Sequence, residues 1–151
     1  MDEHALELRP VTAADRTVWG ELWTGYLAYY ETELPTQVYE TSFARLLSDD
    51  PTSFSGLIAW SGGAAKGLVH WGRHPHMWRP EGVVYLQDLY TVPEARGRGI
   101  ARRLIEAVYA DADARGCPHV YWLTQEFNYA GRMLYDRIGR RTPFIRYDRP
   151  L

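Results

Sequence analysis

The sequence has little cysteine, no marked excess of charge of either sign, and no long apolar run. Among 151 residues the one cysteine is Cys117, which excludes a framework of internal disulfides and is typical of a reducing cytoplasm. The net charge is −2, whereas nucleic-acid-binding domains usually carry a clear positive excess. No stretch is long enough to cross a bilayer, and the acidic start does not resemble a signal peptide. We therefore expect a cytoplasmic protein without nucleic-acid or membrane partners.

The chain is instead rich in aromatic side chains, with six tryptophans and eleven tyrosines. Aromatic residues at this level line a ligand site or a subunit interface, and the composition does not separate the two. The length predicts one domain over residues 1–151, with enough chain to bury most of its apolar surface.

The most informative stretch is a predicted strand, a glycine-containing loop and a predicted helix. Residues 83–92 are mostly β-branched, aromatic or aliphatic and end at Pro93, which cannot donate to a sheet ladder. A loop with Gly97 and Gly99 follows. Apolar residues then recur at helical spacing and predict a helix of roughly four to five turns. These residues are Ile100, Ala101, Leu104, Ile105, Val108 and Ala112.

Such a unit can bind an anion. The first turn of a helix has N–H groups without internal partners, and the helix dipole adds partial positive charge there. Glycine lets a phosphate approach the backbone closely, and Arg96 and Arg98 add charge beside it. The alternative is a helix start in which the glycines serve packing only and the arginines are solvated.

Three nucleotide-binding loops compete for this stretch. A P-loop needs Lys-Ser/Thr where residues 100–101 read Ile-Ala, and a dinucleotide fingerprint needs a third glycine or alanine where Arg102 stands. Residues 96–101 fit Arg/Gln-x-x-Gly-x-Gly/Ala, and they follow Leu-Tyr-x-Val-Pro at residues 89–93. This pattern resembles the pyrophosphate loop of the GNAT superfamily of acyl-CoA-dependent N-acetyltransferases.

The other elements complete an α/β pattern in the order β-α-α-β-β-β-α-β-α-β. The helical crossover predicts parallel neighbours around it, while the Ser-Gly-Gly turn at residues 61–63 predicts an antiparallel hairpin, so the sheet is mixed. The GNAT fold has this order, and the resemblance spans almost the whole chain. Further strands are predicted at 4–10, 53–60, 64–73, 118–124 and 144–149, helices at 12–30, 36–47 and 128–138, and a loop at 74–82.

Three segments resemble the polyamine (diamine) and histone-type branch of the superfamily, namely residues 86–90, 121–125 and 134–137. This resemblance implies an acetyl-CoA co-substrate and a primary amine acceptor, either a small polyamine-like molecule or a protein lysine. It implies that the backbone of Leu89, Tyr90 and Thr91 pairs with the acyl-pantetheine arm and includes an N–H facing the acetyl carbonyl. It also implies a pyrophosphate site made by Arg96, Gly97, Arg98, Gly99, Ile100 and Ala101.

Asn128 and Tyr135 stand seven residues apart, so they share one face of the last predicted helix. They match a second family signature, Asn-x-x-Ala/Gly-x-x-x-Tyr. The resemblance implies that Asn128 contacts the CoA arm and that Tyr135 faces the acyl sulfur. The alternatives are a helix cap for Asn128 and a buried core aromatic for Tyr135.

The sequence departs from the branch at Gln87, where relatives carry the glutamate proposed as base. Glutamine cannot accept a proton. Regular pleating turns the adjacent Asp88 to the opposite face, unless a β-bulge rotates it. Proton removal then falls to Asp88, to Glu31 or Glu33 through water, or to solvent. Asp88 is equally compatible with a structural carboxylate.

Residues 29–35 mix tyrosines with Glu31 and Glu33 and suit recognition of a cationic amine, with Gln87 beside the acceptor. The alternative is an ordinary polar turn between helices. The histidines at 70, 74 and 76 have no partner at recognisable ligand spacing, so we expect no metal.

Three functions are compatible with these features. The leading one is acetyl-CoA-dependent N-acetylation of a primary amine by direct attack. The others are a CoA-binding regulatory domain without turnover, and an interaction protein whose aromatic surfaces serve assembly. The terminal strand at residues 144–149 has nothing after it to cover an edge, and relatives of this branch often dimerise by such strands. We therefore expect a homodimer.

Overall fold

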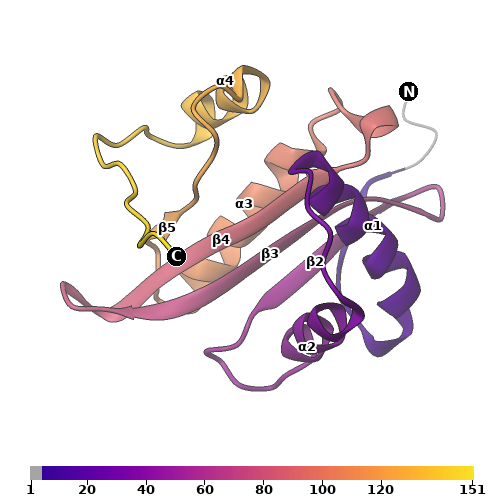
Figure 1. Ribbon diagram of the computed structural model, residues 1–151, viewed down its shortest axis with the longest axis horizontal. Helices are drawn as coiled ribbons and strands as arrows, with labels where there is room; N and C mark the ends of the chain where they lie inside the picture. The colour runs from indigo at the N-terminus through magenta and orange to yellow at the C-terminus, as the bar shows by residue number, and fades with distance from the viewer. Residues whose placement is uncertain (1–4) are drawn as a thin grey trace.

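The computed structural model describes residues 5–151 and contains one five-stranded sheet in the order β1-β2-β3-β4-β5 (Figure 1). The strands are β1 (Glu7–Pro10), β2 (Ser55–Ser61), β3 (Ala64–His76), β4 (Arg79–Thr91) and β5 (Val120–Tyr121). The helices are α1 (Arg16–Tyr29), α2 (Thr36–Leu46), α3 (Ile100–Ala114) and α4 (Tyr129–Ile138), with 3₁₀ turns at Ala13–Asp15 and Pro93–Ala95. Among residues 5–151, no helix is long and apolar enough to span a membrane.

The sheet is mixed, as the order of elements predicts. The first four strands pair antiparallel, and β5 alone runs parallel to its neighbour β4, across the α3 crossover. The element order is therefore confirmed up to α4. The predicted first strand includes His4, which lies outside the described residues.

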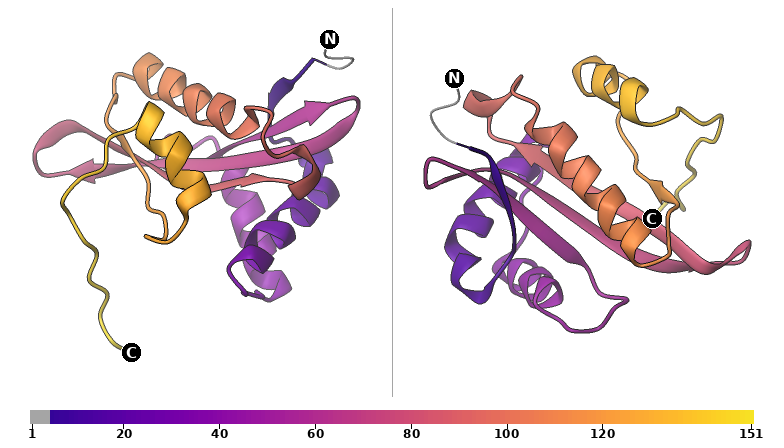
Figure 2. Two further views of the ribbon diagram at one scale, coloured as in Figure 1. Left: turned by 90° about the horizontal axis from the view of Figure 1, so that it is seen from above. Right: turned by 180° about the vertical axis from the view of Figure 1, so that it is seen from behind.

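The sheet separates two layers of helices. Figure 2 shows α3 on one face and α1 with α2 on the other. The apolar stripe of α3 is fully buried at Leu104, Ile105 and Val108. Strand side chains alternate between the two faces of the sheet. Leu68 therefore packs with α1 and α2, and the adjacent Val69 packs with α3.

The expected loop at residues 74–82 is wrong, because β3 and β4 extend into a long hairpin whose turn lies at residues 77–78. Gly82 permits this with a φ of 84° and a close approach to the carbonyl of His74, where a Cβ would lie 2.6 Å from the oxygen. The pairing is irregular between His74 and His76. Pro75, which has no N–H to donate, sits at this irregularity.

The expected strand at residues 144–149 is also wrong. Residues 140–151 form no helix or strand, and the tail runs away from the sheet (Figures 1 and 2). Its apolar side chains, Phe144, Ile145 and Tyr147, are between 77% and 88% exposed. A strand needs a neighbouring strand for its hydrogen bonds, and the tail has none within the described chain.

Candidate active site

The sheet opens between β4 and β5. The two strands pair only at Val84 with Val120 and at Tyr85 with Tyr121, where β5 ends. Strand β4 continues to Thr91, so residues 86–91 have no strand neighbour on this edge within the described chain. The backbone of Leu89, Tyr90 and Thr91 therefore lies along the opening.

The loop from β4 to α3 has the geometry that the glycines predict. Gly97 and Gly99 have φ values of 78° and 81°, and Gly99 is the N-cap of α3. A Cβ built at either glycine meets no atom within 4 Å, so the space in front of the loop is open. Arg96 donates from Nε to the Thr91 carbonyl over 3.1 Å, which ties the loop to the end of β4.

This loop fits a phosphate-bearing co-substrate. The N-terminal turn of α3 begins at Ile100, and the open space lies where an anion would meet its N–H groups. Arg98 is exposed beside it, and Ala101 follows in the helix. Within the described residues, Thr91 Oγ1 is the one buried side-chain polar atom without a partner, and it lies at the strand end that meets the loop.

Asn128 is the N-cap of α4. Its Oδ1 accepts from the Gly131 N–H over 3.2 Å, and its Nδ2 donates to Thr124 Oγ1 over 3.0 Å. A Cβ at position 131 would lie 2.5 Å from Nδ2, which explains the small residue in the signature. The capping interpretation of Asn128 is confirmed, and a contact with CoA stays a prediction.

Tyr135 lies two turns further along α4 and is partly buried. Its ring stands edge-on to Trp122 with centroids 5.6 Å apart. Burial, with smaller contributions from Tyr30 and Tyr29, raises the pKa of Tyr135 to about 12. The phenol is therefore protonated at neutral pH. The same contributions place the end of α1 close to α4.

A β-bulge in β4 decides the orientation of Asp88. His70 pairs with Asp88 and Trp71 pairs with Leu86, so Gln87 is the extra residue. Gln87 is exposed, and Asp88 is 7% exposed and faces α1. The bulge that the sequence left open is therefore present. It turns Asp88 away from the α3 face, where Leu86 packs, to the face that α1 covers.

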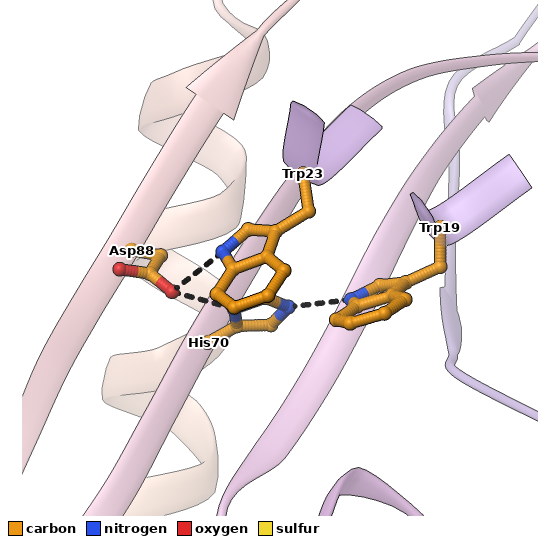
Figure 3. A network of polar contacts seen from close by, with 4 residues as sticks. All are labelled: Trp19, Trp23, His70 and Asp88. Atoms are coloured by element: carbon orange, nitrogen blue, oxygen red, sulfur yellow. Dashed lines mark hydrogen bonds and ion pairs between the residues drawn. The ribbon is translucent and has the colours of Figure 1, made fainter. Parts of the chain in front are cut away.

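Asp88 accepts two hydrogen bonds on one oxygen. Trp23 donates from Nε1 to Oδ2 over 3.2 Å, and His70 Nδ1 lies 2.8 Å from the same oxygen. The other oxygen points away from both partners (Figure 3), and a tenth of the side chain stays exposed. One carboxylate oxygen is thus held by Trp23 and His70, and the Tyr26 hydroxyl adds a further hydrogen bond to the same carboxylate.

Six tyrosines lie near one another, three at the end of α1, two where β4 pairs with β5, and one on α4. Tyr85 stacks on Tyr121 with centroids 4.9 Å apart, and Tyr30 lies 5.2 Å from Tyr26 and 5.0 Å from Tyr29. Burial raises the pKa of Tyr26 far above its usual range, and the charge of Asp88 and a hydrogen bond to its side chain add to the shift. We call this set the tyrosine cluster: Tyr26, Tyr29, Tyr30, Tyr85, Tyr121 and Tyr135.

Glu31 and Glu33 are exposed in the turn after α1. Glu31 has a φ of 52° and is the one non-glycine residue with positive φ in the described chain. The Thr32 N–H bonds the Leu27 carbonyl and the Glu31 N–H bonds the Ala28 carbonyl. This is a Schellman end with glutamate at the position that glycine usually takes.

The sequence did not point to Trp19, Trp23 or His70 as site residues, because their contacts with Asp88 and with one another cross up to 65 residues of chain. His74 and His76, which the sequence analysis considered together with His70, bond to other groups. His74 Nε2 lies 2.8 Å from Tyr121 Oη, and His76 Nδ1 accepts from the Trp78 N–H. No group of three metal-ligating side chains occurs in residues 5–151.

Comparison with known proteins identifies the family. The model of the acetyltransferase (GNAT) family matches residues 18–139. The chain belongs to the GNAT acetyltransferase family. As an acetyltransferase the protein is an enzyme, which sets aside the non-catalytic interpretations.

Curated relatives of this GNAT protein are named acetyltransferases. It is 37% identical over 145 residues to the D-amino-acid N-acetyltransferase HPA3 of Saccharomyces cerevisiae, covering 94% of this chain and 89% of the relative. It is 33% identical over 103 residues to the acetyltransferase ECA0875 of Pectobacterium atrosepticum, covering 68% and 67%. Neither is named for a polyamine or a histone, so that branch stays a prediction.

Solved structures share the fold. The aminoglycoside acetyltransferase AAC(6')-Iy in complex with the bisubstrate analog CoA-S-monomethyl-acetylneamine gives a TM-score of 0.83 at 20% identity, covering 97% of this chain and 99% of that one. The ribosomal-protein-alanine N-acetyltransferase of Brucella melitensis biovar Abortus 2308 gives 0.77 at 20% identity, covering 97% and 100%.

Proposed function

We propose that this GNAT protein transfers the acetyl group of acetyl-CoA to a primary amine by direct attack. The observation that carries the proposal is the opening between β4 and β5, with the glycine loop of α3 at one end and Asp88, Tyr135 and the tyrosine cluster near the other. An extended thioester arm fits along β4 from the loop to the cluster. The yeast relative is itself named an N-acetyltransferase.

The reaction makes three demands. An alkylamine near pKa 10 is mostly protonated at neutral pH, so a base must take a proton from it, and we assign this to Asp88 Oδ1. The carbonyl oxygen gains charge as the amine nitrogen bonds to the acyl carbon, and a backbone N–H of residues 89–91 donates to it. As the C–S bond breaks, Tyr135 gives its proton to the leaving sulfur, and the phenolate then takes a proton back from water.

The loop residues hold the pyrophosphate through the N–H groups of Gly97, Gly99, Ile100 and Ala101 and the charges of Arg96 and Arg98. Asn128 holds the pantetheine arm. Nearest the acceptor we place Glu31, Glu33 and Gln87, whose side chains are exposed. Carboxylates and tyrosine faces both attract an ammonium ion.

The acceptor is a small molecule carrying a primary amine, or a protein lysine. Polyamine-like amines follow from the resemblance of residues 86–90 to that branch, and D-amino acids follow from the 37% identical relative. The acceptor class is tested with a panel that contains a diamine, a lysine peptide, and D- and L-amino acids. Each is incubated with the protein and acetyl-CoA, and mass spectrometry detects the acetylated product. Failure to acetylate any of them would count against the proposed function.

We expect Asp88→Asn to lower kcat more than Gln87→Ala does. Trp23 and His70 both meet one oxygen of Asp88, so an asparagine oxygen can keep them while the amide replaces the other carboxylate oxygen and removes the base. Gln87 is exposed and offers no proton acceptor. Steady-state kinetics of the two variants check this, and an Asp88→Asn enzyme with full activity would mean that another carboxylate or solvent takes the proton.

We expect Glu31→Gly to stabilise the protein and to weaken acceptor binding. Glycine removes the strain at a φ of 52°, which costs a non-glycine residue roughly 1–2 kcal/mol, against a cost of roughly 0.5–1 kcal/mol for its greater backbone freedom. The variant also loses a carboxylate. Tm and the KM for the amine are the readouts. Glu33→Gly is the matched control, because it deletes a neighbouring carboxylate without relieving strain. A stabilised Glu31→Gly with unchanged KM would exclude Glu31 from the acceptor site.

We also propose a homodimer held by the tail. Residues 144–149 form no strand in a single chain, yet they expose three apolar side chains at 77–88% and would pair with a second copy. Light scattering at micromolar protein should give twice the 17.4 kDa of one chain, and removal of residues 143–151 should give the single mass. A monomeric full-length chain contradicts the proposal.

A further inference from the structure

His70 lies in the middle of a chain of hydrogen bonds that ends at Asp88. The residue sits on β3 and is 5% exposed. Trp19 Nε1 lies 2.9 Å from its Nε2, and Asp88 Oδ2 lies 2.8 Å from its Nδ1 (Figure 3). An indole N–H can only donate, so Nε2 accepts and carries no hydrogen. The single ring proton is therefore on Nδ1 and is donated to Asp88.

A second proton on the His70 ring would find no hydrogen-bond acceptor. It would bind to Nε2, and the resulting Nε2–H would face the Trp19 N–H, so that two donors would meet in a buried site. The cation of Arg16 lies 5.5 Å from the Trp19 ring, which adds positive charge on that side. The titratable and charged side chains around the ring and its two partners are Asp88 from β4, Tyr26 and Arg16 from α1, and Tyr39 from α2.

The sheet is shaped to hold the imidazole. Gly56 of β2 pairs with His70, and a Cβ there would lie 3.3 Å from Cδ2 of the ring. The missing side chain leaves the room that the ring occupies. Trp19 and Trp23 of α1 stack with centroids 5.2 Å apart, and each aims its N–H at this network. Asp88 Oδ2 is thus fixed by β3 and α1 together.

We propose that His70 is a positioning residue for acetyl transfer, kept neutral as the Nδ1–H tautomer by Trp19 and orienting Asp88 so that Oδ1 meets the acceptor amine. The catalytic part rests on the proposed function, in which Asp88 is the base. The amine proton passes to Asp88 and stops there, because the Nε2 lone pair is already bonded to Trp19. Asp88 returns the proton to water after the product leaves.

Long-range ¹H–¹⁵N spectra of the histidine rings test the tautomer in the unaltered protein, without any enzymatic assay. At neutral pH the Nδ1 of His70 should carry a hydrogen and its Nε2 should carry none. A hydrogen on Nε2 would overturn the proposal.

Two indole deletions on α1 test the cause. Trp19→Phe keeps an aromatic ring but frees Nε2, so part of the His70 population should carry its hydrogen on Nε2 and present a bare Nδ1 to Asp88. This should lower kcat and leave the KM for acetyl-CoA unchanged. Trp23→Phe removes a donor to Asp88 without touching Nε2, so His70 should keep its hydrogen on Nδ1. A Trp19→Phe protein with the wild-type spectrum and kcat would refute the assignment.

Substitution of His70 itself covers the case in which Trp19→Phe does not fold. His70→Asn places an N–H donor near the position of Nδ1 and should keep more of kcat than His70→Leu, which leaves Asp88 one donor short. Equal loss in both variants would reduce His70 to packing. If Asp88→Asn stays active while the wild-type spectrum still shows hydrogen on Nδ1 of His70, the assignment of Asp88 as base is wrong and the tautomer assignment holds. The two failures are therefore distinguishable.

Discussion

Tyr135→Phe is expected to lower kcat by about 100- to 10,000-fold, the range of general acid–base contributions. The substitution keeps the ring against Trp122 and deletes only the hydroxyl. Since the pKa of Tyr135 is raised to about 12, the hydroxyl keeps its proton at every pH below that value. Loss of activity on the alkaline side below about pH 10 should therefore not come from this group. Steady-state rates across pH measure both effects.

Tyr39→Phe is a matched control. Its hydroxyl bonds Thr24 over 2.8 Å on the α1–α2 side, away from the opening, so its loss should cost about 1 kcal/mol of stability and leave kcat unchanged. The KM for acetyl-CoA should change little in either variant, because the α3 loop supplies most of the binding. A fully active Tyr135→Phe enzyme would mean that Tyr135 serves packing only and that the CoA thiolate leaves without a proton donor.

Gly99→Val is expected to abolish stabilisation by acetyl-CoA. At a hundred times its dissociation constant a ligand adds about 2.7 kcal/mol, which raises Tm by roughly 5–10 °C for a chain of this size. The added side chain would occupy the open space before the α3 N-terminus and strain a backbone with φ of 81°. Thermal unfolding with and without acetyl-CoA measures the loss.

Gly116 provides the control for strain. It has a φ of 68°, its Cβ would also meet nothing within 4 Å, and it lies at the opposite end of α3. Gly116→Val should therefore lose similar stability and keep the full shift with acetyl-CoA. If folded Gly99→Val keeps the shift, the co-substrate binds elsewhere.

The loop and α3 could be predicted because their signals are local. Glycines two apart, Pro93 and an apolar stripe at helical spacing each constrain a few neighbouring residues, and the structure contains the strand, loop and helix that they predict. That the backbone of residues 89–91 is left open for a ligand arm was implied by the resemblance rather than by any residue. The fifth strand is shorter than predicted, residues 120–121 instead of 118–124.

The errors arise where distant parts of the chain decide the conformation. Whether residues 144–149 form a strand depends on a partner strand, and none lies beside them in a single chain. The β3–β4 hairpin depends on the positive φ of Gly82. Glycine is common both in loops and in hairpins, so the sequence does not distinguish the two.

The orientation of Asp88 shows the same limit. Pleating alone puts Gln87 and Asp88 on opposite faces and leaves open which side is buried. The bulge at Gln87 and the donors Trp23 and His70, 65 and 18 residues away, decide it. An aspartate in an apolar strand signals a buried partner, but the sequence does not name that partner.

The most direct measurement of the central proposal is the rate at which free thiol appears from acetyl-CoA as the amine concentration is raised. The proposed function predicts that thiol release saturates with an amine from the panel, equals the acetylated amine formed, and is lost in Gly99→Val. Stabilisation by acetyl-CoA without amine-dependent thiol release from any member of the panel would contradict it.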